Sequence, residues 1–528
     1  MNDTAPTAPQ RPVLPWLLGG VAVVAAGGVI AYVLLSPKPA AESAPPQLRR
    51  EPAEATSEQV HQICAACHVY PPPETFPRSS WRKEVQQGYD FFHKDLTYRF
   101  DYPAMESVLR YYERRAPDVL PPAERSPEGP AGPPMFERRG YRPPGAASQP
   151  GVAHVNLVHL RRKDKLDVLV CDALNKEVLV FSPYESPPSW KVIARGLCCA
   201  HAEVVDLDGD SNLDVILACL GNFYATDDRV GSVVWLKGAA GGTFTQVTLL
   251  DGIGRVADVR AADFRGTGKL DLVVAEFGWH EVGSILLLEN QTTDRAKPTF
   301  VPRTLDKRHG TTHVPVADLN GDGKPDFVAA ISQEFESVVA FLNQGGGQFT
   351  KETIFTGSHP TLGTNGIQLV DLNGDGKLDV LLSNGDSLDP PYLLRPDHGI
   401  TWLENRGQYP FAPHRLANSY GAGSPVAADF RGTGRLDVAY VNFLPAEFFP
   451  QRAPPNHVDA VGLLTQVEPG KFVHRALEEA NCDHLTCAAG DLDGDGLPDL
   501  VVGNYVRGGG PGDSITIWWN RTGKPAAK

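Results

Sequence analysis

The sequence predicts a mainly β protein, in which a seven-bladed β-propeller follows a small all-α domain and an apolar N-terminal segment. Three observations predict this architecture. A nine-residue pattern rich in Asp and Gly recurs along the second half of the chain at intervals of 47 to 62 residues. The sequence Cys64-Ala-Ala-Cys67-His68 precedes this array, and residues 13–36 carry no charge.

The apolar segment at residues 13–36 is 24 residues long. It is long enough to cross a bilayer as one helix and longer than the apolar core of a cleaved signal peptide. We expect a transmembrane anchor here, with residues 1–12 in the cytoplasm, and a signal cleaved near Ala40 is the alternative. Residues 37–56 are rich in Pro and Ala, which is typical of a semi-rigid tether.

The Cys64-Ala-Ala-Cys67-His68 sequence has the spacing of a c-type haem attachment site. Each thiol would add to one vinyl group of the haem, and the adjacent imidazole would become the proximal ligand of the iron. A thioredoxin-like dithiol and half of a zinc site are the alternatives, but no second Cys-x-x-Cys follows nearby. Because covalent haem attachment takes place outside the cytoplasm, we expect a single-pass inner-membrane protein with its folded domains in the periplasm.

Residues 57–120 are expected to form the haem domain, and residues 121–134 a linker. Three helices are predicted: one that runs into Cys64, one that starts near Ser80, and one that starts near Pro103 and ends before the next proline. This arrangement resembles a small monohaem cytochrome c. The resemblance implies one covalently bound haem c.

The distal side of the haem has three candidate arrangements. The resemblance implies Met105 as the sixth iron ligand, because such cytochromes usually place a distal Met between the haem motif and the end of the last helix. Met105 stands at a predicted helix start rather than on a loop. His93 is the alternative ligand, and an open sixth position is the third arrangement.

The repeated pattern places oxygen-bearing side chains at loop positions 1, 3, 5 and 9 in four copies, with Gly at position 6 in three of them. Alternating oxygens on a tight loop are the ligands that Ca²⁺ prefers. Each copy leads into a β-rich apolar stretch, so the loops should precede strands. We therefore expect one Ca²⁺ per copy, about four per chain. The predicted ligands are Asp206, Asp208, Asp210, Asp214, Asp318, Asn320, Asp322, Asp326, Asp371, Asn373, Asp375, Asp379, Asp491, Asp493, Asp495 and Asp499.

Three further copies lack the full ligand set. The copies that begin at Asp263 and Asp429 carry Arg at position 3, and we expect its guanidinium to supply the positive charge in place of the ion. The copy that begins at His159 retains only the final Asp. Seven copies at this spacing correspond to one four-stranded blade each, and therefore to seven blades over residues 135–528.

The motif at this spacing resembles the FG-GAP/VCBS repeats of integrin-α-like propellers. The resemblance covers residues 135–528 and implies that each calcium loop joins the innermost strand of a blade to its second strand. The last blade ends at Trp518-Trp519-Asn520 without an outer strand of its own. Residues 135–143 are therefore predicted to complete it and to join the two ends of the array.

Alignment of the copies places polar residues on one face of the innermost strands. Five residues before each loop, the first four copies carry His154, His201, Asp258 and His313. Because side chains alternate along a strand, these residues should line the central channel. Three imidazoles and one carboxylate could hold a transition metal; a substrate-binding ring, a proton relay and a solvated polar lining are the alternatives.

Six cysteines lie outside the haem motif. An oxidising compartment permits disulfides, so we expect a bridge between Cys482 and Cys487. A bridge between the adjacent Cys198 and Cys199 is a second candidate. The formal net charge of −14 argues against nucleic acids and anionic membrane surfaces as partners.

Two classes of function follow, with a weaker third. The favoured one is a membrane-anchored monohaem cytochrome that carries electrons, with the calcium-stabilised propeller as docking platform for a redox partner protein or a membrane electron-transfer complex. The alternative is an oxidoreductase whose propeller oxidises a small molecule or carbohydrate and passes electrons to the haem. An adhesion or glycan-binding propeller is the third. The first needs only the haem motif and the calcium loops.

Overall fold

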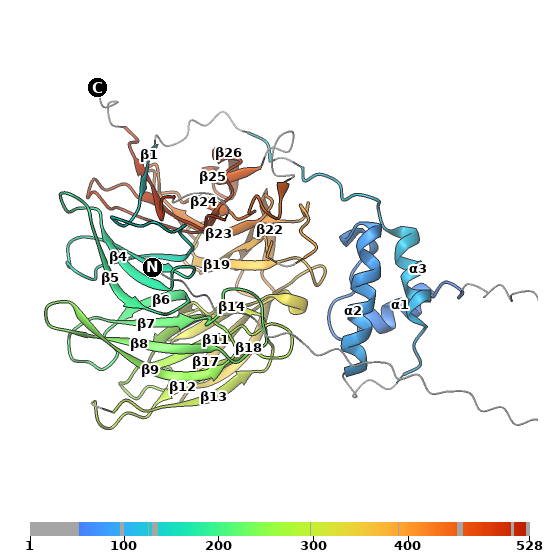
Figure 1. The fold of residues 1–528 in the computed structure, drawn as a ribbon, viewed down its shortest axis with the longest axis horizontal. Coiled ribbons are helices and arrows are strands. Elements are labelled where there is room, and N and C mark those ends of the chain that lie inside the picture. The colour runs from blue at the N-terminus through green and yellow to red at the C-terminus, as the bar shows by residue number, and fades with distance from the viewer. Residues whose placement is uncertain are drawn as a thin grey trace, which may run out of the picture. The chain divides into compact units, whose positions relative to one another are not determined.

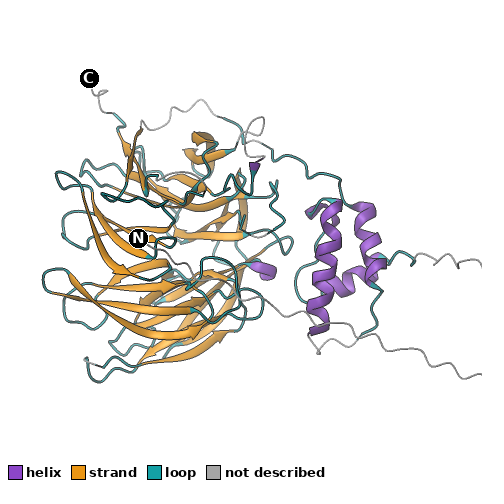
Figure 2. Cartoon of the chain, viewed as in Figure 1, coloured by secondary structure: helices purple, strands orange, loops and turns teal. Residues whose placement is uncertain are grey.

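The computed structural model describes residues 52–94, 100–124, 126–128, 136–295, 297–388, 390–450, 458–507 and 512–523. The segment predicted to be a membrane anchor, residues 13–36, lies outside these residues, as do residues 1–12 and most of the predicted tether. Within the described residues, no helix is both long and apolar enough to cross a membrane. The described chain begins with helices and continues as strands (Figure 2).

The helical part contains the three predicted helices. The first begins with a capping box: Thr56 Oγ1 accepts a hydrogen bond from Gln59 N at 3.2 Å, and Gln59 Oε1 accepts one from Thr56 N at 2.9 Å. The third ends before Pro117, as predicted, because the residue before a proline disfavours helical geometry. The elements are α1 (Ser57–Cys64), η1 (Pro73–Thr75), η2 (Arg78–Ser80), α2 (Trp81–Lys94) and α3 (Met105–Arg115).

Aromatic side chains fill the core of the helical part. The rings of Trp81 and Tyr112 stack with centroids 3.8 Å apart, and Trp81 Nε1 donates a hydrogen bond to Pro73 O at 3.0 Å. Cys64 and Met105 both pack against this core. One of the predicted attachment cysteines and the favoured distal ligand therefore pack against the same hydrophobic core.

The β part is the predicted seven-bladed propeller, with seven sheets of antiparallel strands (Figure 1). The innermost strands of successive blades contact one another around the ring. The first three blades are β2 (Val152–Val158), β3 (Asp167–Asp172), β4 (Glu177–Ser182) and β5 (Ser189–Arg195); β6 (Cys199–Val205), β7 (Asp214–Cys219), β8 (Gly231–Ala239) and β9 (Thr243–Ile253); and β10 (Val256–Ala262), β11 (Asp271–Glu276), β12 (Ser284–Asn290) and β13 (Phe300–Asp306).

The remaining four blades follow in chain order, and the innermost strand of blade four is split in two. They are β14 (Thr311–His313) with β15 (Val316–Ala317), β16 (Asp326–Ile331), β17 (Ser337–Gly345) and β18 (Gln348–Thr356); β19 (Thr364–Val370), β20 (Asp379–Asn384), β21 (Gly399–Glu404) and β22 (Ala412–Asn418); β23 (Ala422–Ala428), β24 (Asp437–Asn442), β25 (Asp459–Glu468) and β26 (Lys471–Glu479); and β27 (His484–Gly490), β28 (Asp499–Asn504) and β29 (Ile515–Asn520) with β1 (Phe136–Tyr141). A short turn, η3 (Gln333–Phe335), follows β16.

The ring closes as the sequence predicts. Strand β1 pairs antiparallel with β29, with Phe136 opposite Asn520 and Tyr141 opposite Ile515. The indole Nε1 of Trp519 also donates a hydrogen bond to the Tyr141 hydroxyl at 3.1 Å. The two ends of the repeat array are therefore held in one sheet.

Every second strand of a blade begins at a buried Asp, the final residue of the repeated pattern. In blade two, Asp214 Oδ2 accepts a hydrogen bond from Leu207 N at 2.9 Å, and Oδ1 accepts one from Gly238 N at 2.7 Å. This Asp therefore ties the loop to the third strand, which explains its presence even in the degraded copy. The seven residues, each 1 % exposed or less, are Asp167, Asp214, Asp271, Asp326, Asp379, Asp437 and Asp499.

Candidate functional site

The predicted haem-attachment residues lie at the end of α1. Cys64 is its last residue, and Cys67 and His68 lie on the bends that follow. His68 Nδ1 lies 2.8 Å from the carbonyl oxygen of Val69, so Nδ1 carries the proton and Nε2 keeps its lone pair. A hydrogen bond of this kind fixes the tautomer and orientation of a metal-binding imidazole.

The surroundings of this motif fit a covalently bound haem. Two thiols and one imidazole supply the attachment groups, and the aromatic core of Trp81 and Tyr112 supplies an apolar surface. Burial raises the pKa of the Cys64 thiol to about 11, so it is protonated at neutral pH. When bound, the haem would supply one-electron redox chemistry at its iron.

The two candidate distal ligands differ in their surroundings. Met105 is the first residue of α3, is partly buried and packs against the core that Cys64 also contacts. His93 is exposed in the last turn of α2, with Nε2 3.0 Å from the Tyr102 hydroxyl. The contact with the shared core favours Met105.

The four complete loops lie between the first and second strands of blades two, four, five and seven. In the loop of blade four, Asp318 accepts hydrogen bonds from the backbone N–H groups of Gly321 and Gly323, both at 2.8 Å. Gly323 has φ +80°, a left-handed conformation that explains why position 6 favours Gly. The position-1 carboxylate therefore closes the loop on itself.

In two of these loops the acidic side chains converge. One carboxylate oxygen from each of three residues lies within 4.8 Å of the others, as Ca²⁺ coordination requires. Basic side chains lie at both clusters: Lys237 pairs with Asp208, and Arg521 Nη1 lies 2.8 Å from Asp493 Oδ2. The converging sets are Asp206, Asp208 and Asp210, and Asp491, Asp493 and Asp499.

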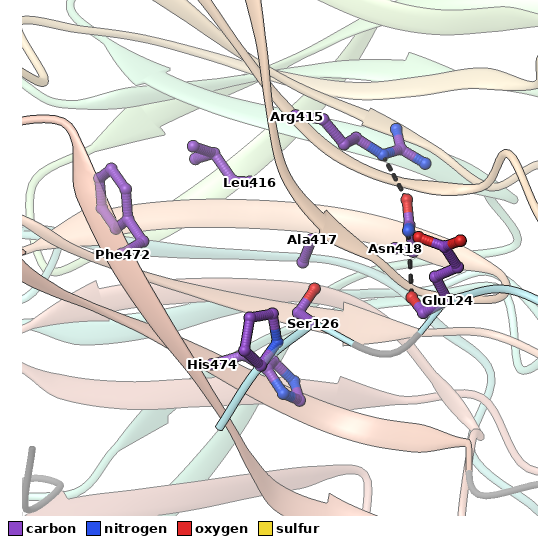
Figure 3. Close-up of a pocket in the computed structure, with 9 residues that line it drawn as sticks. Glu124, Ser126, Arg415, Leu416, Ala417, Asn418, Phe472 and His474 are labelled. Atoms are coloured by element: carbon purple, nitrogen blue, oxygen red, sulfur yellow. Dashed lines mark hydrogen bonds between the residues drawn. The ribbon is translucent and has the colours of Figure 1, made fainter. Parts of the chain in front are cut away.

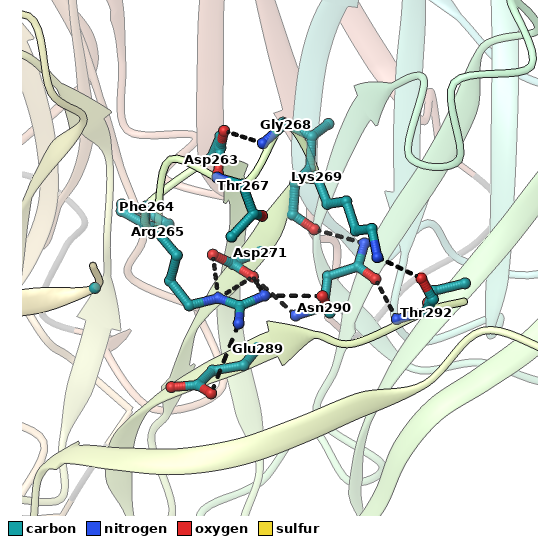
Figure 4. Close-up of polar contacts among 12 residues, drawn as sticks. Asp263, Phe264, Arg265, Thr267, Gly268, Lys269, Asp271, Glu289, Asn290 and Thr292 are labelled. Carbon is teal, nitrogen blue, oxygen red and sulfur yellow. Dashed lines mark hydrogen bonds and ion pairs between the residues drawn. The ribbon is translucent and has the colours of Figure 1, made fainter. Parts of the chain in front are cut away.

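The loops with Arg at position 3 hold an internal ion pair. In blade three, Arg265 Nε lies 3.1 Å from Asp271 Oδ1, and Nη2 donates a hydrogen bond to Asn290 O at 2.8 Å (Figure 4). In blade six, Arg431 Nη2 lies 2.9 Å from Asp437 Oδ1. The geometry agrees with the prediction that a guanidinium supplies the positive charge in these two loops.

The four inner-strand residues of blades one to four come together around Asp258. His201 Nδ1 lies 3.0 Å from Asp258 Oδ1, and His313 Nδ1 lies 3.8 Å from Asp258 Oδ2. The rings of His154 and His201 have centroids 4.4 Å apart. These residues belong to β2, β6, β10 and β14, so four blades contribute to one cluster.

The centre of this inner cluster is buried, whereas His154 and His313 are partly exposed. Asp258 is fully buried and His201 is 2 % exposed. The Asp258 carboxylate also accepts hydrogen bonds from Arg260 Nε at 3.0 Å and from the backbone N–H of Val314 at 2.9 Å. Arg260 was not among the predicted site residues, although it lies on the same strand face as Asp258.

Burial and Arg260 set the charge states of the inner cluster. Burial, with a further contribution from Arg260, lowers the pKa of His154 to about 3 and that of His201 well below its usual range. Burial opposes ionisation of Asp258, but the Arg260 guanidinium outweighs it and holds the pKa of Asp258 well below its usual range. Burial raises the pKa of the neighbouring Glu203 to about 7. The cluster therefore combines the neutral imidazoles of His154 and His201 with the Asp258–Arg260 ion pair and with the Glu203 carboxyl group, whose pKa lies near neutral pH.

All eight cysteines lie in the described part of the chain, and no disulfide joins any two of them. The predicted bridge between Cys482 and Cys487 is wrong, because their thiols donate to different carbonyl groups, those of Asp459 and Ser424. No bridge joins Cys198 to Cys199. Instead Cys199 and Cys219 are opposite each other on β6 and β7, with their sulfur atoms 2.8 Å apart.

A cavity of about 210 Å³ lies between Glu124, Ser126 and Pro127 on one side and the outer strands β22 and β26 on the other (Figure 3). Asn418 connects its walls, because its Nδ2 donates to Glu124 O at 3.0 Å and its Oδ1 accepts from Arg415 Nε at 2.9 Å. None of the described residues that line it is a predicted site residue. The cavity therefore adds nothing to the predicted chemistry.

Comparison with family models identifies two kinds of module. Residues 60–130 match the family described as dihaem cytochrome c. Residues 200–274 and 298–382 match the FG-GAP-like repeat, and residues 487–518 match the FG-GAP repeat. The chain therefore contains a cytochrome c domain followed by FG-GAP repeats, although it has a single Cys-x-x-Cys-His sequence.

Individual proteins are similar over parts of the chain. Cartilage acidic protein 1 of Mus musculus is 24 % identical over 257 residues, which are 46 % of this chain and 38 % of that protein. The chain thus spans less than half the length of this relative. Two crystal structures of BBS1N in complex with ARL6DN, soaked with mercury and with lead, have TM-scores of 0.41 and 0.42 at 10 % identity. The matches cover 73 % and 74 % of this chain, and 96 % and 98 % of those chains.

Proposed function

We propose that this chain is a membrane-anchored c-type cytochrome that carries electrons through one haem, with its propeller as the docking platform for a redox partner. The observation that carries the proposal is the Cys64-Ala-Ala-Cys67-His68 motif, which lies within the segment that matches a cytochrome c family. The His68 Nδ1–carbonyl contact supports it, because it leaves Nε2 for the iron. A cytochrome domain joined to an FG-GAP propeller is suited to electron transfer between proteins.

In this proposal the four complete loops hold Ca²⁺. The convergence of carboxylates in the loops of blades two and seven supports this assignment. The ions would neutralise clustered carboxylates and stiffen the connection between the first and second strands. The propeller would then present a rigid surface to a partner.

The proposal places both folded parts in the periplasm, behind an anchor at residues 13–36. The uncharged length of that segment supports the anchor, and covalent haem attachment requires an extracytoplasmic domain. The two features therefore demand the same topology.

An oxidoreductase with its site in the inner cluster is the second candidate. The observation that favours it is Glu203, whose pKa burial raises to about 7 beside the neutral imidazole of His201. A carboxyl group that titrates near the working pH is suited to general acid–base catalysis. The full set of hydrogen bonds to Asp258 gives this cluster a structural role as well.

The test is a haem and metal count on the full-length protein, produced with the haem-maturation machinery and solubilised in detergent. We expect one covalently bound haem by pyridine haemochrome assay and one iron per chain. The Cys64→Ser/Cys67→Ser variant should bind no haem covalently, and the Cys482→Ser/Cys487→Ser variant is the matched control. A wild-type protein without covalent haem would refute the proposal.

A further inference from the structure

Two imidazoles and one carboxylate meet on blades three and four at a place that no repeat motif marks. His280 follows β11, His309 follows β13, and Glu334 lies in η3 after β16. One donor atom from each lies within 4.8 Å of the others. The three residues come from connections between second and third strands and between successive blades. Because consecutive strands are antiparallel, these connections lie on the face opposite to the predicted calcium loops.

The geometry of this three-residue cluster leaves its nitrogens poorly satisfied. His309 Nε2 lies 2.8 Å from Glu334 Oε1, and His280 Nδ1 lies 3.9 Å from Glu334 Oε2. Both nitrogens are buried, and within the described part of the chain neither makes a hydrogen bond of acceptable geometry. Buried polar atoms without such bonds are unfavourable. A cation bound by the two nitrogens and the carboxylate would satisfy all three groups.

The surrounding residues hold the three side chains in place. Asp227 Oδ1 accepts three consecutive backbone N–H groups, beginning with that of His280, at 2.9 to 3.0 Å. Gly283 lies so close to His309 that a Cβ at position 283 would be 2.5 Å from the His309 Cβ. The ring of Phe335 lies 5.1 Å from that of His309. Supports of this kind fix the orientation of metal ligands before an ion binds.

We propose that His280, His309 and Glu334 bind a divalent transition-metal ion. Two imidazoles and one carboxylate are a ligand set for Zn²⁺ or Fe²⁺, whereas Ca²⁺ requires a cage of oxygen atoms. The side chains are 12 to 28 % exposed, so an ion from solution can reach them. Three protein ligands leave further coordination positions for water or an added ligand.

The site is distinct from both kinds of metal site predicted from the sequence. It shares no residue with the Asp-rich loops or with the inner cluster of His201, Asp258 and His313. A bound ion here would give the protein a second transition-metal centre besides the iron of the predicted haem.

Zinc is the probe that tests this site. It is redox-inactive, and elemental analysis counts it separately from the iron of the haem. The full-length haem protein is stripped with EDTA, supplied with excess Ca²⁺ to fill the oxygen-ligand loops, and dialysed against Zn²⁺. We expect one zinc per chain. X-ray absorption at the zinc edge should show scattering from coordinated imidazoles.

Three variants assign the zinc to residues. Glu334→Gln and His309→Gln should each weaken zinc binding more than about tenfold, and should lose the zinc-dependent rise in melting temperature. His414→Gln is the matched control, because it breaks a single imidazole–carboxylate pair, in which His414 Nε2 lies 2.8 Å from Glu404 Oε2. It should leave zinc binding unchanged.

Melting curves without zinc show whether each variant still folds. Zinc that is retained by Glu334→Gln and His309→Gln but lost from His201→Gln would place the ion in the inner cluster and overturn the proposal. A wild-type chain that binds no zinc under these conditions would also overturn it. If Glu334→Gln fails to fold, His280→Gln supplies the same comparison. Failure here leaves the haem count of the proposed function untouched.

Discussion

The Nε atom of Arg265 lies 3.1 Å from both carboxylate oxygens of Asp271. This ion pair places a positive charge inside the loop of blade three, and Arg431 does the same in blade six. In the four loops with the full ligand set, position 3 holds Asp or Asn. Two blades therefore carry their own cation, and four are predicted to take one from solution.

Substitution of Arg265 tests the internal ion pair. Arg265→Met leaves the fully buried Asp271 without its charged partner, and we expect a loss of about 3 kcal/mol in the free energy of unfolding. Urea denaturation measures it. The control Arg162→Met removes an exposed pair with Asp164 and should leave the free energy of unfolding close to that of the wild type. Equal effects from the two variants would contradict a structural role for the pair.

Removal of calcium tests the four complete loops. EDTA should lower the melting temperature, and added Ca²⁺ should restore it; occupancy at a hundred times the dissociation constant contributes about 2.7 kcal/mol per site. Asp375→Ala, at position 5 of the blade-five loop, should reduce the fall in melting temperature that EDTA causes. Thr267→Ala, at the same position of an Arg-containing loop, should leave it unchanged. An EDTA-insensitive wild type would exclude calcium stabilisation.

The pH dependence of stability tests Glu203. Burial raises its pKa from 4.5 to about 7 in the folded protein, so its contribution is fully present below pH 4.5 and is lost as the pH rises through 7. Between these values the wild type should lose stability relative to Glu203→Gln, by about 3 kcal/mol. Urea midpoints across this range measure the difference. The exposed Glu352→Gln should follow the wild type, and a parallel curve for Glu203→Gln would refute the assignment.

Replacement of Met105 tests the sixth iron ligand. Met105→Ala should keep the covalent haem but lower its reduction potential, because a Met axial ligand raises the potential of a His-ligated haem. Redox titration followed in the visible spectrum measures this. His93→Ala is the matched control. If only His93→Ala changes the potential, His93 is the ligand.

The architecture could be predicted from sequence because its main signals are periodic. The final Asp of each copy is buried in every blade, and in six of the seven it accepts a backbone hydrogen bond from the end of the third strand. It therefore persists even where the ion-binding residues do not. The alternation of side chains along the inner strands was enough to predict that His201 and Asp258 lie on the same face. The absence of an outer strand after Trp519 was enough to predict that β1 completes the last blade.

Other features depend on three-dimensional details that the spacing of the repeats does not encode. The Cys199–Cys219 contact follows from the pairing register of β6 and β7, which spacing alone does not define. His280 and Glu334 come from connections of unequal length, so alignment of the repeats does not bring them into correspondence. The burial of the inner cluster depends on how closely the innermost strands approach one another.

The pairing of Phe136 with Asn520 also determines when the ring can close during synthesis. The outer strand of the last blade is made before any other strand, but its partner is made after all of them. Contacts this distant in sequence form slowly. The helical domain is therefore synthesised in full while the ring is still open.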